Sequence, residues 1–140
     1  MKLIERIKAM NTQYELPFYD KPTFAILPGD FISRMENFQD ILAEELKEGD
    51  PVVILQDDPI GTLTELADWL GDIVVYCYSE AMRYGIPLDE VLSIIMDSNE
   101  SKLSADGKPI KDERGKFLKG PYYWKPEPVI YALLKLRSAS

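Results

Sequence analysis

The sequence predicts an all-α protein, a bundle of four to five helices with a long loop near the C-terminus. The first observation is that apolar residues recur at helical spacing over 31–48 and again from about 62 to 84. The second is that glycine and proline separate these stretches, so the links between helices are short. The third is that the one apolar run that resembles a strand, 52–55, has no evident partner strand.

Two long helices follow a short one in the N-terminal part of the chain. Residues 1–27 predict a short helix and then an irregular arm, because prolines interrupt the second half. The two long helices are expected to end at glycine, near Glu48-Gly49 and Tyr84-Gly85. Side chains that accept a hydrogen bond from the first turn are expected to cap them: Asp30 for the first, and Thr62 or Thr64 for the second.

The C-terminal part contains two shorter helices separated by a long segment. Pro87 begins a helix of about ten residues that runs through Asp97. Residues 100–128 form a polar and aromatic segment rich in glycine and proline, and 127–137 predict a closing helix. Loops as long as 100–128 are uncommon in small domains and are often functional.

Length and composition set further limits. A chain of 140 residues with 46% hydrophobic residues predicts one folded domain over 1–140. No apolar stretch is long enough to cross a bilayer, and charges interrupt the apolar residues at the N-terminus, unlike a signal peptide. The single cysteine, Cys77, fits a reducing compartment. We therefore expect a cytoplasmic protein that does not bind membranes.

The chain has no histidine. This absence removes the usual general base, the serine and cysteine triads and the histidine-rich zinc sites. Any metal must therefore be bound by oxygen ligands, which favour magnesium, manganese or calcium.

Charge is unevenly distributed along the chain. The net charge of −8 argues against binding duplex nucleic acid through its backbone. Residues 1–99 have a net charge of −12, and residues 100–140 have a net charge of +4. An acidic body with a basic C-terminal part suits a ligand made of metal and polyphosphate; the alternative is a solvated acidic surface beside a lysine-rich loop.

The second long helix carries carboxylates on an otherwise apolar surface. From Leu66 to Tyr78 its only charged residues are Asp68 and Asp72, and with Glu65 they stand at i, i+3 and i+7 on one face. Such a column on a buried helix is unfavourable unless it is compensated. The possible compensations are a basic partner, raised pKa values or a metal ion. Basic candidates are few: Arg34, Lys47 and Arg83.

The first long helix supplies further acids. Glu45 and Glu48 lie along the edge of its apolar stripe, whereas Glu44 points further towards solvent. Glu45 and Glu48 are therefore the two that could meet the acids of the second long helix and form an oxygen-rich site. The alternative is that all are surface acids on two amphipathic helices.

Two acidic motifs and a three-part segment resemble a known superfamily. The acids form Glu44-Glu45-Leu46-Lys47-Glu48 and Glu65-Leu66-Ala67-Asp68. They are similar to the Glu-Glu-x-x-Glu … Glu-x-x-Asp pattern of the all-α NTP pyrophosphatases, which include MazG, the dimeric dUTPases and phosphoribosyl-ATP pyrophosphohydrolase. The segment is more specific and resembles a MazG-like, dUTPase-like branch: Asp97-Ser98-Asn99-Glu100-Ser101-Lys102-Leu103, Asp106-Gly107-Lys108-Pro109-Ile110 and Gly115-Lys116-Phe117-Leu118-Lys119-Gly120-Pro121-Tyr122-Tyr123.

The resemblance, which covers roughly 38–128, implies a role for each matching residue. It implies a bundle of the all-α NTP pyrophosphatase type, with 1–27 as an N-terminal arm and 100–128 as a loop that closes on the substrate. The magnesium ligands, with manganese as the alternative metal, would be Glu45, Glu48, Glu65 and Asp68. Glu44 would orient or activate water. Phosphate contacts and loop closure would fall to Asn99, Lys102, Lys116, Lys119 and Tyr123.

A second alignment with MazG gives Asp72 a larger part. There the last aspartate directly precedes an apolar run, as Asp72 precedes 73–75 here, but this alignment places Trp69 at a ligand position. We therefore prefer Glu65 and Asp68, with Asp72 as a further acid on the same face and a possible ligand for another metal.

The implied activity is magnesium-dependent hydrolysis of a nucleoside triphosphate to a monophosphate and pyrophosphate, with nucleotide-pool housekeeping as one expected role. Two alternatives remain: hydrolysis of phosphoribosyl-ATP, and a non-catalytic helical dimer that binds metal or nucleotide. A small bundle with one helix apolar nearly all round is expected to complete its core against another copy, so we expect a homodimer or homotetramer.

Overall fold

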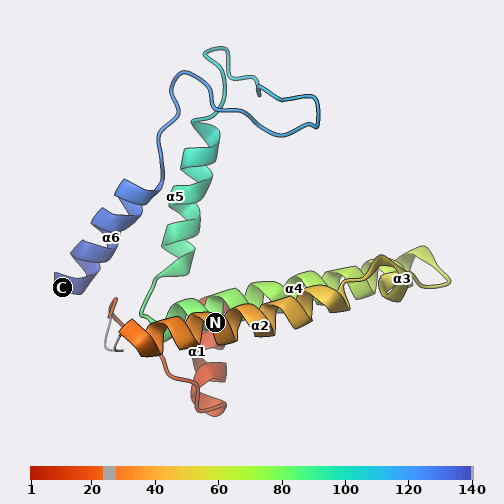
Figure 1. Cartoon of the computed structure of the whole chain (residues 1–140), viewed down its shortest axis with the longest axis vertical. Coiled ribbons are helices and arrows are strands. Elements are labelled where there is room, and N and C mark those ends of the chain that lie inside the picture. Colours follow the sequence, from red (N-terminus) through yellow and green to blue (C-terminus); the bar gives the residue numbers. More distant parts are fainter. Residues whose placement is uncertain (24–27, 140) are drawn as a thin grey trace. The chain divides into compact units, whose positions relative to one another are not determined.

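The computed structural model describes residues 1–23 and 28–139, and within these ranges the chain is helical (Figure 1). The described residues form six α-helices and no β-strand; one isolated antiparallel bridge joins Lys111 and Phe117. The prediction of an all-α protein is confirmed. No helix in the described ranges is both long enough and apolar enough to cross a membrane.

The chain divides into two compact units, Met1–Gly85 and Ile86–Ser140. The first unit contains α1 (Leu3–Gln13), α2 (Pro28–Glu48), α3 (Pro51–Ile54) and α4 (Pro59–Arg83). The second contains α5 (Leu88–Glu100) and α6 (Glu127–Ala139). The expectation of one domain over 1–140 stays a prediction.

In the first unit, α2 and α4 lie side by side and run in opposite directions, with α3 at the turn between them (Figure 1). Helix α1 packs against α4, and Ile7 of α1 is buried, as are Ala81 and Met82 of α4. A buried polar contact joins the same two helices, because the Ser79 hydroxyl donates to the Asn11 side-chain oxygen at 2.8 Å. These contacts fix the three helices that surround the candidate site.

The segment after α1 returns to the C-terminal end of α4. The backbone N–H of Tyr19 donates to the Met82 carbonyl, and that of Thr23 donates to the Tyr84 carbonyl. Gly85 makes this approach possible, because its φ is +65° and a Cβ there would lie 1.9 Å from the Lys21 carbonyl oxygen. A side chain at this position would exclude the arm from the end of α4.

The predicted caps of the two long helices are wrong. Helix α2 begins at Pro28, so Asp30 lies in its first turn, where a negative charge still suits the helix dipole. Helix α4 begins at Pro59, and the Asp58 side chain caps it by accepting from the Gly61 N–H at 2.8 Å. Thr62 and Thr64 lie inside the helix, and each hydroxyl donates to the carbonyl four residues before it.

The apolar run after α2 forms one helical turn, α3. Asp50 caps this turn through a 2.9 Å hydrogen bond from the Val52 N–H, and Pro51 stands at the first helical position. This turn accounts for the sixth helix, beyond the predicted four to five.

In the second unit, α5 and α6 pack together, and the segment between them is tied to the end of α5. Ser98, only 2% exposed, donates its hydroxyl to the Trp124 carbonyl at 2.9 Å. The Ser101 hydroxyl accepts from the Trp124 N–H at 3.2 Å. The N–H of Gly120 donates to the Lys102 carbonyl, and a Cβ at Gly120 would lie 2.4 Å from the Leu103 carbonyl oxygen. The two serines of the Ser-Asn-Glu-Ser-Lys motif thus attach the end of this segment to the end of α5.

Candidate metal centre

Three carboxylates on α2 and α4 act electrostatically on a fourth, that of Glu45. Glu45 is only 8% exposed, whereas the other three, Glu48, Asp68 and Asp72, are exposed. Burial is the largest cause that raises the pKa of Glu45, and the charges of Glu48, Asp72 and Asp68 raise it further. The Glu48 side chain raises this pKa also through a hydrogen-bonding interaction. Acids from both helices therefore meet around one buried carboxyl group.

Trp69 fixes the register of the two helices beside this cluster. Its indole N–H donates to the backbone carbonyl of Glu45 at 2.8 Å. Its ring covers Gly49, where a Cβ would lie 2.2 Å from the ring carbon Cε2. Trp69 follows Asp68 directly, so the contact that holds α4 against the end of α2 also positions Asp68 near Glu45.

No basic side chain in the described residues neutralises this cluster. Arg34 and Arg83 both pair with Glu80: the Arg34 Nε donates to Glu80 at 3.2 Å, and the Arg83 Nε lies 3.5 Å from the same carboxylate. Lys47 makes no ion pair with a described residue. Of the three compensations that the sequence allows, a basic partner is therefore absent among the described residues, whereas burial and the neighbouring acids raise the pKa of Glu45.

The donor set fits a divalent cation that prefers oxygen. The Glu45 Oε1 atom is buried and has no hydrogen-bond partner among the described residues, an unfavourable state that a cation would relieve. As they stand, no three acidic or cysteine side chains in the described parts are arranged to hold an ion. Glu48, Asp68 and Asp72 are exposed, so these side chains are less restricted by packing than Glu45.

Two of the predicted site acids are not among those whose charges raise the pKa of Glu45. Glu44 and Glu65 are exposed, and their charges are not among the causes of the raised Glu45 pKa. Asp68 and Asp72, four residues apart on one face of α4, are among them. Asp72 therefore acts electrostatically on Glu45, and the roles of Asp72 and Glu65 as ligands both stay predictions.

The predicted phosphate contacts belong to the second unit. Asn99 and Lys102 line a pocket of about 410 Å³ at the end of α5, together with residues of the loop. The Lys119 ammonium lies 5.0 Å from the centre of the Tyr123 ring. Lys116 is exposed, and its backbone N–H donates to the Asp112 carboxylate in a turn. Asn99 and Lys102 therefore lie in the lining of one pocket, and Lys119 and Tyr123 contact each other.

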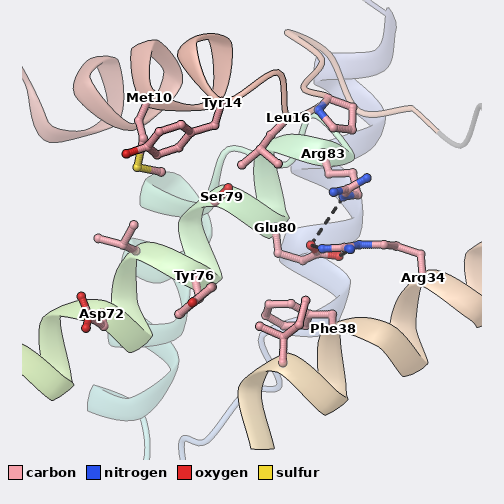
Figure 2. A pocket seen from close by; sticks show the side chains of 13 residues that line it. Met10, Tyr14, Leu16, Arg34, Phe38, Asp72, Tyr76, Ser79, Glu80 and Arg83 are labelled. Atoms are coloured by element: carbon pink, nitrogen blue, oxygen red, sulfur yellow. Dashed lines mark hydrogen bonds and ion pairs between the residues drawn. The ribbon is translucent and has the colours of Figure 1, made fainter. Parts of the chain in front are cut away.

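A second pocket, of about 460 Å³, adjoins the carboxylate cluster in the first unit (Figure 2). Apart from Asp72, a possible metal ligand, the sequence analysis predicted no site role for its residues. The signal was present, because Arg34, Phe38, Ile41, Glu45 and Glu48 recur at three- and four-residue spacing along one face of α2. The segment before residue 38 has no match in the family patterns, so only the packing of α1 and α4 reveals this pocket.

We expect the metal-free protein to lose stability as pH rises from 4.5 towards neutrality. The pKa of Glu45 lies above its ordinary value of 4.5 in the folded state, so the folded protein retains a proton that the unfolded chain releases. The stabilisation is complete below pH 4.5 and is lost as pH rises through the folded pKa. Thermal unfolding in EDTA between pH 4.5 and 7.5 measures it, and Glu45→Gln should flatten the dependence relative to Glu36→Gln, an exposed acid on the same helix. Equal slopes for the two variants would contradict the assignment.

Comparisons with known proteins support the fold. No protein-family model matches the chain, and no curated protein matches its sequence. The chain is similar to a solved structure of a proposed NTP pyrophosphohydrolase from Exiguobacterium sp. 255-15, with a TM-score of 0.57 and 18% sequence identity over 99% of each chain. At this identity the likeness concerns the fold alone, so the chain shares the helical fold of that structure.

Proposed function

We propose that this protein hydrolyses a nucleoside triphosphate between the α- and β-phosphates and releases a nucleoside monophosphate and pyrophosphate. The observation that carries the proposal is the cluster of Glu45, Glu48, Asp68 and Asp72, which has a buried unpaired oxygen and no basic partner among the described residues. The likeness in fold to a proposed NTP pyrophosphohydrolase agrees with it.

The residues that would hold magnesium or manganese are Glu45, Glu48, Asp68 and Asp72, with Glu65 as a further ligand one turn before Asp68. When bound, such a cation neutralises phosphate oxygens and stabilises the charge that develops on the departing pyrophosphate. Glu45 is buried, and the exposed acids would complete the ligand set. Because the chemistry needs no imidazole, the absence of histidine is compatible with this reaction.

The remaining roles follow the position and charge of the side chains. Glu44 is exposed beside the cluster and accepts a proton from, or orients, the attacking water. Asn99 and Lys102 would contact the phosphates, as the resemblance to the superfamily implies. Lys116, Lys119 and Tyr123 belong to the loop that covers the nucleotide and excludes water.

A homodimer or homotetramer remains part of this proposal. Several large apolar side chains on α2, α3 and α4 are half or more exposed in the single chain, and a second copy would cover them: Leu46, Val52, Val53, Ile60, Leu63 and Leu70. An exposed apolar surface of this kind is typical of an interface.

The test is a panel of ribo- and deoxyribonucleoside triphosphates, together with phosphoribosyl-ATP, assayed for pyrophosphate release with and without magnesium. We expect release from at least one nucleoside triphosphate, abolished by EDTA and restored by magnesium or manganese. Release of orthophosphate instead of pyrophosphate would place the cleavage at another bond. No release from any nucleotide, with no thermal stabilisation by nucleotide and magnesium, would overturn the proposal.

A further inference from the structure

The pocket beside the carboxylate cluster is bounded by three helices and has two chemically different ends. Its walls come from α1 and the turn after it, from α2 and from α4. Asp72 lies at one end and the Arg34–Glu80–Arg83 group lies at the other, as Figure 2 shows. Between them the wall is largely apolar and aromatic, with Tyr14, Phe38, Val75 and Tyr76 among its residues. Volumes of this size are typical of small-molecule sites.

On each of the two long helices near this pocket, an arginine and an acidic residue are separated by the same number of residues. Along α2, Arg34 precedes Glu45 by eleven residues, and along the antiparallel α4, Asp72 precedes Arg83 by eleven. Eleven residues of helix span roughly 16 Å. Both helices therefore place an arginine at one end of the pocket, and α4 places Asp72 at the other end, with apolar residues between.

Glu80 holds both arginines of this pocket in place. Glu80 is half-buried and accepts from both nitrogens of Arg34 that face it, while Arg83 approaches the same carboxylate. The buried Arg83 Nε has no hydrogen bond within the described residues. Two arginines and one glutamate leave a net positive charge at this end, which suits hydrogen-bond acceptors such as carbonyl oxygens.

We infer that this pocket binds the nucleoside part of the triphosphate, with a carbonyl-bearing base directed towards Arg34 and Arg83. The inference rests on the proposed function, because Asp72 belongs to both the carboxylate cluster and the pocket wall. The phosphates at the cluster and the base in the pocket then share one continuous site. Tyr14, Phe38 and Tyr76 supply flat aromatic surface against which a base packs.

Methionine methyl NMR on the full chain tests this inference without hydrolysis. Met10 lines the pocket, whereas Met96 belongs to the second unit and lines the other pocket. The protein is labelled with ¹³C at the methionine methyl groups, and Met10→Leu identifies the Met10 signal. The probes are free uridine, thymidine, cytidine, inosine and adenosine, with neither phosphate nor metal present. We expect at least one carbonyl-bearing nucleoside to shift the Met10 signal saturably and more than adenosine does, while the Met96 signal stays in place.

Two variants give the matched comparison. Val75→Phe fills the pocket and should abolish the shift; in the nucleotide assay it should raise KM more than it lowers kcat. Val74→Phe makes the same change one residue earlier, at an exposed position outside the pocket, and should behave as wild type. If Val75→Phe does not fold, the wild-type titration alone decides.

The outcomes separate this inference from the proposed function. Pyrophosphate release without any nucleoside-induced Met10 shift would overturn the pocket assignment and leave the function intact. A saturable Met10 shift in a protein that hydrolyses no triphosphate would support the pocket and overturn the function. A shift strongest with adenosine would contradict recognition of a base carbonyl.

Discussion

Replacing Glu45 with glutamine is expected to lower pyrophosphate release by at least about 100-fold, because loss of outer-shell partners of a metal alone costs roughly 10–100-fold in metal affinity or activity. The charges of Glu48, Asp68 and Asp72 all raise the pKa of Glu45. The Glu45 Oε1 atom is buried and unpaired among the described residues, so it is the oxygen that a metal ion would most stabilise. The amide keeps the shape of the side chain but carries no charge. The measurement is kcat/KM for the preferred nucleotide over a range of magnesium concentrations.

A measurement of stability distinguishes loss of the site from misfolding, because activity should fall while the unfolding temperature rises. Glu45→Gln removes a buried negative charge that three neighbouring acids repel, so the metal-free variant should unfold at a higher temperature than wild type at neutral pH. The matched control is Glu36→Gln, at an exposed position on α2 outside the cluster, for which activity and stability should both stay at wild-type values. Wild-type kinetics for Glu45→Gln would show that the site has been assigned to the wrong residues.

Gly49→Ala is expected to destabilise the protein by about 1–3 kcal/mol, the usual range for overpacking at a close contact. The added Cβ would lie 2.2 Å from Trp69 Cε2 and 2.3 Å from Cζ2, so the indole ring or the end of α2 must move. Movement of the ring also loosens its hydrogen bond to the Glu45 carbonyl. Because Asp68 precedes Trp69 in α4, the same displacement should weaken magnesium binding. Urea unfolding and magnesium titration measure the two effects.

A matched glycine substitution and a double-mutant cycle test the stated cause. Gly71 lies in α4, and a Cβ at this position would have no neighbouring atom within 4 Å, so Gly71→Ala should be neutral or stabilise the helix by up to about 1 kcal/mol. In a Trp69→Phe background the smaller ring leaves room for the methyl group, so Gly49→Ala should cost less than in the wild-type protein. An equal cost in both backgrounds would mean that contact with Trp69 is not the reason.

Local sequence was sufficient to predict the helical class, because the apolar spacing of each long helix lies within that helix. It was less reliable for helix ends, where several side chains compete for the same backbone groups. Asp58 caps α4 ahead of Thr62 and Thr64 because Pro59 fixes the first helical residue directly after it. The run 52–54 became a helical turn because Asp50 and Pro51 favour one, and no partner strand is present in the described residues.

The composition of the site was also predictable in part, since helical spacing alone places Asp68 and Asp72 on one face and Glu45 and Glu48 on another. Which acids meet depends on the rotation and offset of α2 against α4, which no single helix encodes. The indole hydrogen bond from Trp69 to the Glu45 carbonyl and the space left by Gly49 set that offset. They bring Asp72, rather than Glu65, within the electrostatic reach of Glu45.

The sequence by itself determined the helices, the absence of imidazole chemistry and the excess of acid in residues 1–99, because these depend on residue identity and near-neighbour spacing. Only the tertiary structure decided that Arg34 and Arg83 share Glu80 and leave the acid cluster without a basic partner among the described residues. It also decided that α1 closes a pocket beside that cluster. The physical reason is that charge pairing and cavity shape depend on distances between residues far apart in the chain, and packing sets those distances.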